Sequence, residues 1–181
     1  MAPRFCDAPR LLVLIGLLLP GLLVGCDATG PDPAERGAFT ATLRGAAEVE
    51  FRGEAVHESV EGEALLGVLT NFSIRLTDRK WSSTRRAIYF VRGTPEELTV
   101  GTYPLLDLSG DDPARLDPGR VWAYVNDPGD EVAYSRGGEL RIVEARGDRI
   151  AGTFRFPAGP LSDSSRTPTV WAEGSFNSLR R

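Results

Sequence analysis

Residues 72–77 read FSIRLT, and apolar side chains alternate with polar ones along the whole stretch. In an extended chain Phe72, Ile74 and Leu76 lie on one face, and the polar side chains between them lie on the other. This alternation is typical of an antiparallel strand with one buried face. Residues 39–45, FTATLRG, repeat the pattern. The period of two therefore predicts a fold built of strands.

Further segments with strand composition follow along the chain, and turn residues separate them at short intervals. RGTPEE, NDPGDE, SRGG and the RGD of residues 146–148 supply the Gly, Pro, Asp and Asn that favour turns. Many short strands at such spacing predict a single antiparallel β-sandwich or barrel-like domain of about eight to ten strands. The remaining expected strands cover residues 47–56, 63–69, 87–92, 102–107, 121–125, 139–144, 150–156 and 169–176.

Helix signals are scarce. Residues 94–98, TPEEL, have a good helix start, with Thr94 as an N-cap and Pro95 at the first helical position, and they predict about one turn. Residues 111–117, DDPARLD, are a second candidate. No segment has the length of a βαβ crossover helix, so the sequence disfavours parallel sheets.

The N-terminus is typical of an export signal. Arg4 and Arg10 precede an apolar run over residues 11–24, which has the length of a signal-peptide core and is short for a membrane span. Residues 23–26, LVGC, resemble the lipobox of bacterial lipoprotein precursors, in which the cysteine sulfur receives a diacylglycerol and the preceding peptide is removed. Two alternatives stay open: a short helix that remains in the membrane, and ordinary cleavage that leaves Cys26 as a free thiol.

This interpretation divides the chain into a lipoprotein signal peptide at residues 1–25, a lipidated Cys26 with a flexible tether at residues 26–37, and an all-β domain at residues 38–181. Because two or more acyl chains hold a protein stably at a bilayer, we expect an exported protein attached by lipid to a membrane of the cell envelope. It would lie on the periplasmic or the outer-membrane side, and the choice of membrane stays open.

The charge of the chain bears on its partners. Its formal net charge is −4 and it has no basic run, which argues against binding to a phosphate backbone. We therefore expect no nucleic-acid partner. The expected partners are the membrane, through the lipid, and an envelope protein or a glycan. We expect a monomer without a cofactor.

Several segments together resemble uncharacterised lipoproteins of the Bacteroidota and their relatives. They are FTATLRG at residues 39–45, GTYPL at 101–105, GELRIVEARGDRIAGTFRF at 138–156 and WAEGSF at 171–176. The resemblance implies an all-β sandwich or barrel on a lipid anchor, and it implies no catalytic residue. The sequence itself gives Gly152 and Gly174 a structural role, because glycine in a strand suits a bulge or close packing under an aromatic ring.

The inventory of reactive side chains is small. His57 is the only histidine, and no thiol would remain in the mature domain, so neither a Cys/His pair nor a zinc site of several N or S ligands can be built. Because glutamates surround His57, we expect it in a solvated turn or at a strand edge. A weaker alternative is a calcium site at Asp107, Asp111 and Asp112, although Asp with Gly is also ordinary turn composition.

Aromatic side chains are the remaining candidates for a ligand site. An aromatic ring offers a flat apolar surface with a polar edge, which suits a glycan, but a row of such rings on a strand is also common in cross-strand packing. The candidate ligand-binding residues are Trp81, Trp122, Tyr124 and Trp171, with Tyr89 and Tyr134 as further aromatic residues of the strands.

The sequence favours a binding or structural module of the cell envelope over an enzyme. One alternative is a lipocalin-like carrier that closes a barrel around a small apolar ligand, which requires an internal cavity. Another is a hydrolase that uses two carboxyl groups facing one cleft.

Overall fold

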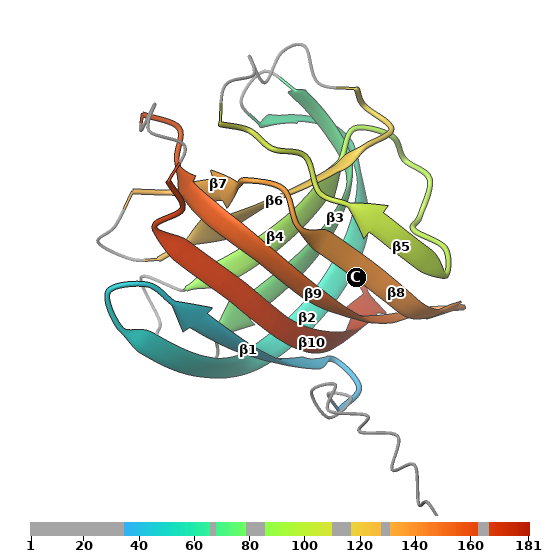
Figure 1. Ribbon diagram of the computed structural model, residues 1–181. Coiled ribbons are helices and arrows are strands. Elements are labelled where there is room, and N and C mark those ends of the chain that lie inside the picture. The colour runs from blue at the N-terminus through green and yellow to red at the C-terminus, as the bar shows by residue number, and fades with distance from the viewer. Residues whose placement is uncertain (1–34, 66–67, 79–85, 110–116, 128–130, 163–166) are drawn as a thin grey trace, which may run out of the picture.

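The computed structural model describes residues 35–65, 68–78, 86–109, 117–127, 131–162 and 167–181. In this part of the chain the secondary structure is all β (Figure 1). Its strands are β1 (Ala38–Arg44), β2 (Glu48–Leu65), β3 (Val68–Asp78), β4 (Ala87–Arg92), β5 (Gly101–Pro104), β6 (Val121–Asn126), β7 (Ala133–Ser135), β8 (Glu139–Arg146), β9 (Arg149–Pro160) and β10 (Val170–Arg180).

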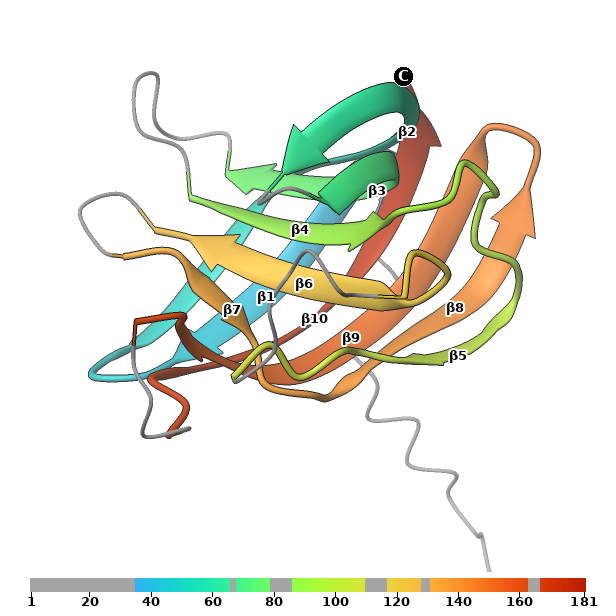
Figure 2. The same cartoon turned by 90° about the horizontal axis from the view of Figure 1, so that it is seen from above.

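The strands close into a barrel. β1 pairs with β2 on one side and with β10 on the other, so the first and last strands are neighbours. The pairing continues from β2 through β3, β4, β6, β7 and β9 back to β10, which completes an eight-stranded antiparallel barrel. Figure 2 shows β3, β4 and β6 in one wall and β1, β10 and β9 in the other. Of the two predicted architectures, the molecule adopts the barrel.

β5 and the segment after it complete the barrel wall between β8 and β6. β9 pairs with β8 along its first part and with β7 along its last part, while β7 pairs with β6 only through Tyr124 and Val125 of β6. Residues 105–108 lie in the space between, where the amide of Leu106 donates to Val121 O and the amide of Leu108 donates to Ser135 O. The buried Ser135 hydroxyl donates to Leu106 O at 2.8 Å and accepts from the amide of Ala123 at 3.1 Å.

Phenyl rings occupy the barrel interior. Phe90 lies 5.2 Å from Phe154, 5.8 Å from Phe156 and 6.2 Å from Phe176, measured between ring centroids, so its ring contacts side chains from the opposite wall. Small side chains such as Ala123 complete the same buried cluster. Alternation of large and small inward residues is how a narrow barrel fills its lumen.

Two glycines make room for these rings. A Cβ on Gly152 would lie 2.3 Å from Arg141 O and 3.1 Å from the Phe176 ring, and a Cβ on Gly174 would lie 2.3 Å from Thr40 O. β8 also carries a bulge opposite Gly152, between Ile142 and Glu144. The structural role expected for both glycines is confirmed, because any larger residue would clash with a neighbouring strand.

The strand predictions are largely confirmed, with three differences. Residues 63–69 form no separate strand, since they contain the end of β2 and the start of β3, and the short strand β7 was not expected. The helical turn predicted at residues 94–98 is wrong: these residues follow a bent path without a helix, and Leu98 is buried in the core. The second helix candidate falls almost wholly outside the described residues.

Candidate functional site

Three tyrosines form a row on the outer face of the barrel, which we call the tyrosine row: Tyr89, Tyr124 and Tyr134. Tyr89 on β4 pairs directly with Tyr124 on β6, and Tyr124 pairs with Tyr134 on β7. Ile88 and Phe90 on either side of Tyr89 belong to the barrel core, so the tyrosine between them points outward. The row thus crosses three neighbouring strands.

The rings of the tyrosine row cover one another. Tyr89 and Tyr124 lie 4.5 Å apart with an interplanar angle of 8°, so the two ring faces stack and the ring edges point to solvent. Trp122 lies 5.7 Å from Tyr124 and is only 2% exposed, because Val91, Leu106 and Leu108 cover it. The row therefore offers ring edges and hydroxyl groups to a ligand, with Trp122 packed behind it.

Trp171 on β10 has a different environment. Its indole is 47% exposed, and its chain neighbour Ala172 points into the core, which directs Trp171 outward. It lies between Arg44 of β1 and Pro157 of β9 in the strand register. No ring contact in the described part of the chain involves Trp171, and it is the one aromatic side chain among the exposed large apolar residues of that part.

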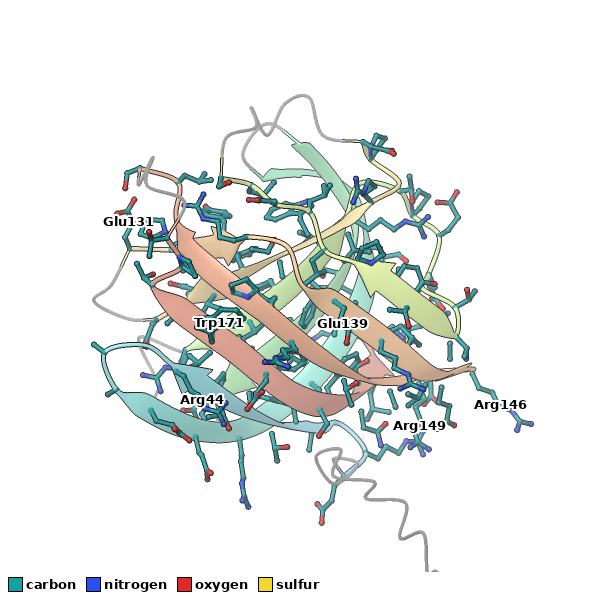
Figure 3. The ribbon with its side chains drawn as sticks, viewed as in Figure 1. Arg44, Glu131, Glu139, Arg146, Arg149 and Trp171 are labelled. Atoms are coloured by element: carbon teal, nitrogen blue, oxygen red, sulfur yellow. The ribbon has the colours of Figure 1, made fainter. Side chains whose placement is uncertain are left out.

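Charged side chains lie beside the Trp171 indole. Arg44 Nη2 binds Glu173 Oε1 at 2.8 Å, and Arg44 Nε lies 3.4 Å from Glu48 Oε2. Arg155 on β9 pairs in register with Glu173 on β10 and Glu139 on β8. Figure 3 shows Trp171, Arg44 and Glu139 on the same side of the barrel. A ring face beside guanidinium donors and carboxylate acceptors can hold a polyhydroxylated ligand.

His57 lies inside the barrel, so its expected place in a solvated turn or at a strand edge is wrong. The side chain is 1% exposed, and its Nδ1 lies 2.9 Å from Ser178 Oγ. The Ser178 hydroxyl donates to Ile150 O at 2.9 Å, so His57 Nδ1–H is the donor to Ser178. The other ring nitrogen, Nε2, is buried without a hydrogen-bond partner.

Burial lowers the pKa of His57 below its ordinary value. Glu97 and Asp148 act in the opposite direction, and Arg180 adds to the lowering. Because the Ser178 hydroxyl proton is engaged by a carbonyl, the pair is a structural hydrogen bond and not a nucleophile activated by a base. The burial of His57 could have been predicted from strand alternation. His57 lies on the same face of β2 as Phe51 and Ala55, which are both core residues.

The structure describes only some of the other candidate site residues. Cys26, Trp81, Asp111 and Asp112 lie outside the described residues, and Asp107 is exposed and accepts the amide of Ser109 at 2.8 Å. No group of three His, Cys, Asp or Glu side chains in the described ranges could hold a metal ion. Those ranges contain no helix long and apolar enough to cross a membrane.

The acidic side chains that form ion pairs do so with arginines. Glu144 binds Arg149 at 3.3 Å, and Asp127 binds Arg86 at 2.9 Å. In each pair the carboxylate is engaged by a guanidinium group of a neighbouring strand or turn. No model of a known protein family, no curated protein and no solved structure matches the chain.

Proposed function

We propose that this protein is a lipid-anchored binding module of the bacterial cell envelope that holds a saccharide on the outer surface around Trp171. The exposed indole of Trp171 beside the Arg44–Glu173 ion pair carries the proposal. The apolar C–H face of a pyranose would stack on the indole, and its hydroxyl groups would bind the guanidinium and the carboxylate. The rigid strands β1 and β10 would position these groups before the ligand binds.

The anchor in this proposal is Cys26. Its support is the order of a basic start, an apolar core and LVGC at residues 23–26. A lipidated Cys26 would hold the barrel beside the glycans of the envelope. Replacement of Cys26 by Ala should move the mature protein from the detergent phase to the aqueous phase in a two-phase partition, and an unchanged partition would contradict the anchor.

The two alternatives have less support. A closed eight-stranded barrel has the architecture that a lipocalin-like carrier needs. The contacts of Phe90 with rings of β9 and β10, however, fill the position where an apolar ligand would sit. For a carboxylate-dependent hydrolase, Glu144 and Asp127 are poorly suited, because each is committed to an arginine.

The saccharide proposal can be tested with purified peptidoglycan sacculi and with a soluble N-acetylglucosamine tetramer. Trp171→Ala should weaken binding about tenfold or more, since truncation of a tryptophan at the centre of a binding surface costs about 2 kcal/mol or more. Leu161→Ala is the matched control, because Leu161 is also an exposed apolar side chain and lies outside the strand pairings of Trp171. The Tyr89→Phe variant tests whether the ligand binds at the tyrosine row instead.

Unchanged binding by the Trp171 variant, with loss in the Tyr89 variant, would move the site to the tyrosine row. The absence of binding by the unaltered protein to either probe would reject the saccharide proposal.

A further inference from the structure

We infer that the end of the barrel where β8 turns into β9 faces the membrane and contacts the head groups of anionic lipids. We call this surface the β8–β9 tip and define it by Val100, Val143 and Arg146. The inference rests on the lipid anchor proposed above, and it adds an orientation and a second surface to that proposal.

The N-terminal chain enters the barrel at this end. Arg36 binds Asp148 in the β8–β9 turn at 2.7 Å, and the amide of Gly37 donates to Asn177 O at 2.7 Å. The amide of Arg180, near the end of β10, donates to Asp148 O. The described chain just before β1 is therefore held against the turn that carries Arg146.

The chain between the proposed anchor and this end is short. Glu35 lies nine positions after Cys26, and nine residues span only about 30 Å even when fully extended, whereas a random coil of that length averages about 16 Å. The β8–β9 tip would therefore stay within this distance of the bilayer. The opposite end, with the β1–β2 turn, lies a strand length further away.

Two exposed valines lie together at the tip. Val100 is 64% exposed and Val143 is 54% exposed, and they are two of the four large apolar side chains exposed in the described residues. The register that pairs Gly101 with Ile142 places Val100 beside Val143. Val143 is also the extra residue of the β8 bulge, which turns it outward. Such a pair can enter the head-group region of a bilayer at little cost.

The charges at the tip suit an anionic surface. Three carboxylates there already have arginine partners: Asp148 binds Arg36, Glu144 binds Arg149, and Glu97 binds Arg180. Arg146 is exposed and has no ion pair in the part of the chain that the structure describes, and Figure 3 shows it pointing away from the barrel. Because charges more than about 10 Å from the surface are screened, the acidic remainder of the molecule contributes little there.

The test places a fluorophore at the tip of the full lipidated protein. Val143→Cys would carry the only free thiol, since Cys6 leaves with the signal and the Cys26 sulfur carries the lipid. Ala46→Cys is the matched control, because Ala46 is exposed in the β1–β2 turn at the opposite end. Both are labelled with an environment-sensitive dye and bound to vesicles of phosphatidylethanolamine and phosphatidylglycerol. Flotation of the vesicles reports anchoring, and quenching by aqueous iodide reports contact.

We expect both labelled proteins to float, with iodide quenching about threefold weaker at position 143 than at position 46. Arg146→Glu should weaken this protection, since one basic contact with an anionic surface contributes about fivefold in affinity, whereas Arg52→Glu on the outer face of β2 should not. Flotation with equal quenching at both positions would refute the orientation alone. Failure to float would refute the anchor and, with it, this inference. Equal protection on neutral phosphatidylcholine vesicles would refute the role of anionic head groups.

Discussion

His57 makes the stability of the barrel depend on pH in a way that the structure specifies. His57→Asn keeps a donor toward Ser178 and removes the imidazole, the only one in the chain. The pKa of His57 is lowered in the folded protein, so the unfolded chain binds the proton more readily. The stabilisation by neutral His57 is complete above pH 6.5, the ordinary value, and is lost as the pH falls from there through the folded pKa.

The size of the effect follows from the one proton that His57 binds when the protein unfolds. If His57 stays neutral in the fold at pH 5.5, the free energy of unfolding falls by about 1.2 kcal/mol between pH 7 and pH 5.5. This is an upper bound for one histidine, and it applies because Nε2 is buried without a partner, so its protonation would add an unpaired buried N–H. Carboxyl groups with ordinary pKa values change little over this interval.

Urea unfolding at pH 7 and at pH 5.5, followed by tryptophan fluorescence, measures the difference. The unaltered protein should lose up to about 1.2 kcal/mol on acidification, and His57→Asn should lose much less, whatever its own stability at pH 7. Equal losses in the two proteins would refute the reasoning, as would a stability that rises on acidification.

Three further substitutions test the barrel itself. Gly174→Ala should destabilise the fold by about 1–3 kcal/mol through the clash with Thr40 O. Gly101→Ala should change the unfolding midpoint little, because its Cβ would meet only the Tyr103 ring, at 3.9 Å. Phe90→Ala should cost about 3–5 kcal/mol in urea unfolding because it empties the centre of the ring cluster, and a loss below 1 kcal/mol would indicate a loosely filled lumen. Ser135→Ala removes two buried hydrogen bonds, so hydrogen exchange at the Leu106 and Leu108 amides should accelerate while exchange in β10 stays slow.

Local pattern was sufficient to predict most strands. FSIRLT lies in β3 with Phe72, Ile74 and Leu76 buried, as its alternation predicts. The turn predicted at residues 146–148 is the β8–β9 turn, in which Gly147 has a φ of 62° that favours glycine. Such features depend on neighbours in sequence, and a period of two reports them directly.

Features that depend on distant contacts were not predictable in the same way. Whether the strands form a sandwich or a barrel depends on the pairing of β1 with β10, which no local pattern contains. Trp122 is on the outer face yet buried, because Leu106 and Leu108 cross over it from another part of the chain. Residues 94–98 have the signals of a helix start, but burial of Leu98 in the core overrides that local preference.

The same contrast between local pattern and distant contacts applies to the candidate site. Trp171 and Tyr124 were both candidates from the sequence, but only the structure distinguishes them. Tyr124 is stacked between neighbouring rings, and Trp171 is exposed beside Arg44. His57 was misplaced because its flanking glutamates suggested solvent. Glu54 and Glu58 alternate with His57 along β2, so they lie on its outer face while His57 points inward.

The indole N–H resonances of the three tryptophans provide the most direct test of the proposed saccharide surface. The Trp171→Phe variant assigns one of the three signals in a ¹H–¹⁵N spectrum, and the N-acetylglucosamine tetramer is then titrated into the unaltered protein. We predict that the Trp171 signal shifts with saturation while the buried Trp122 signal keeps its position. A Trp171 signal that stays fixed at saturating tetramer, or a shift confined to Trp122, would contradict the account.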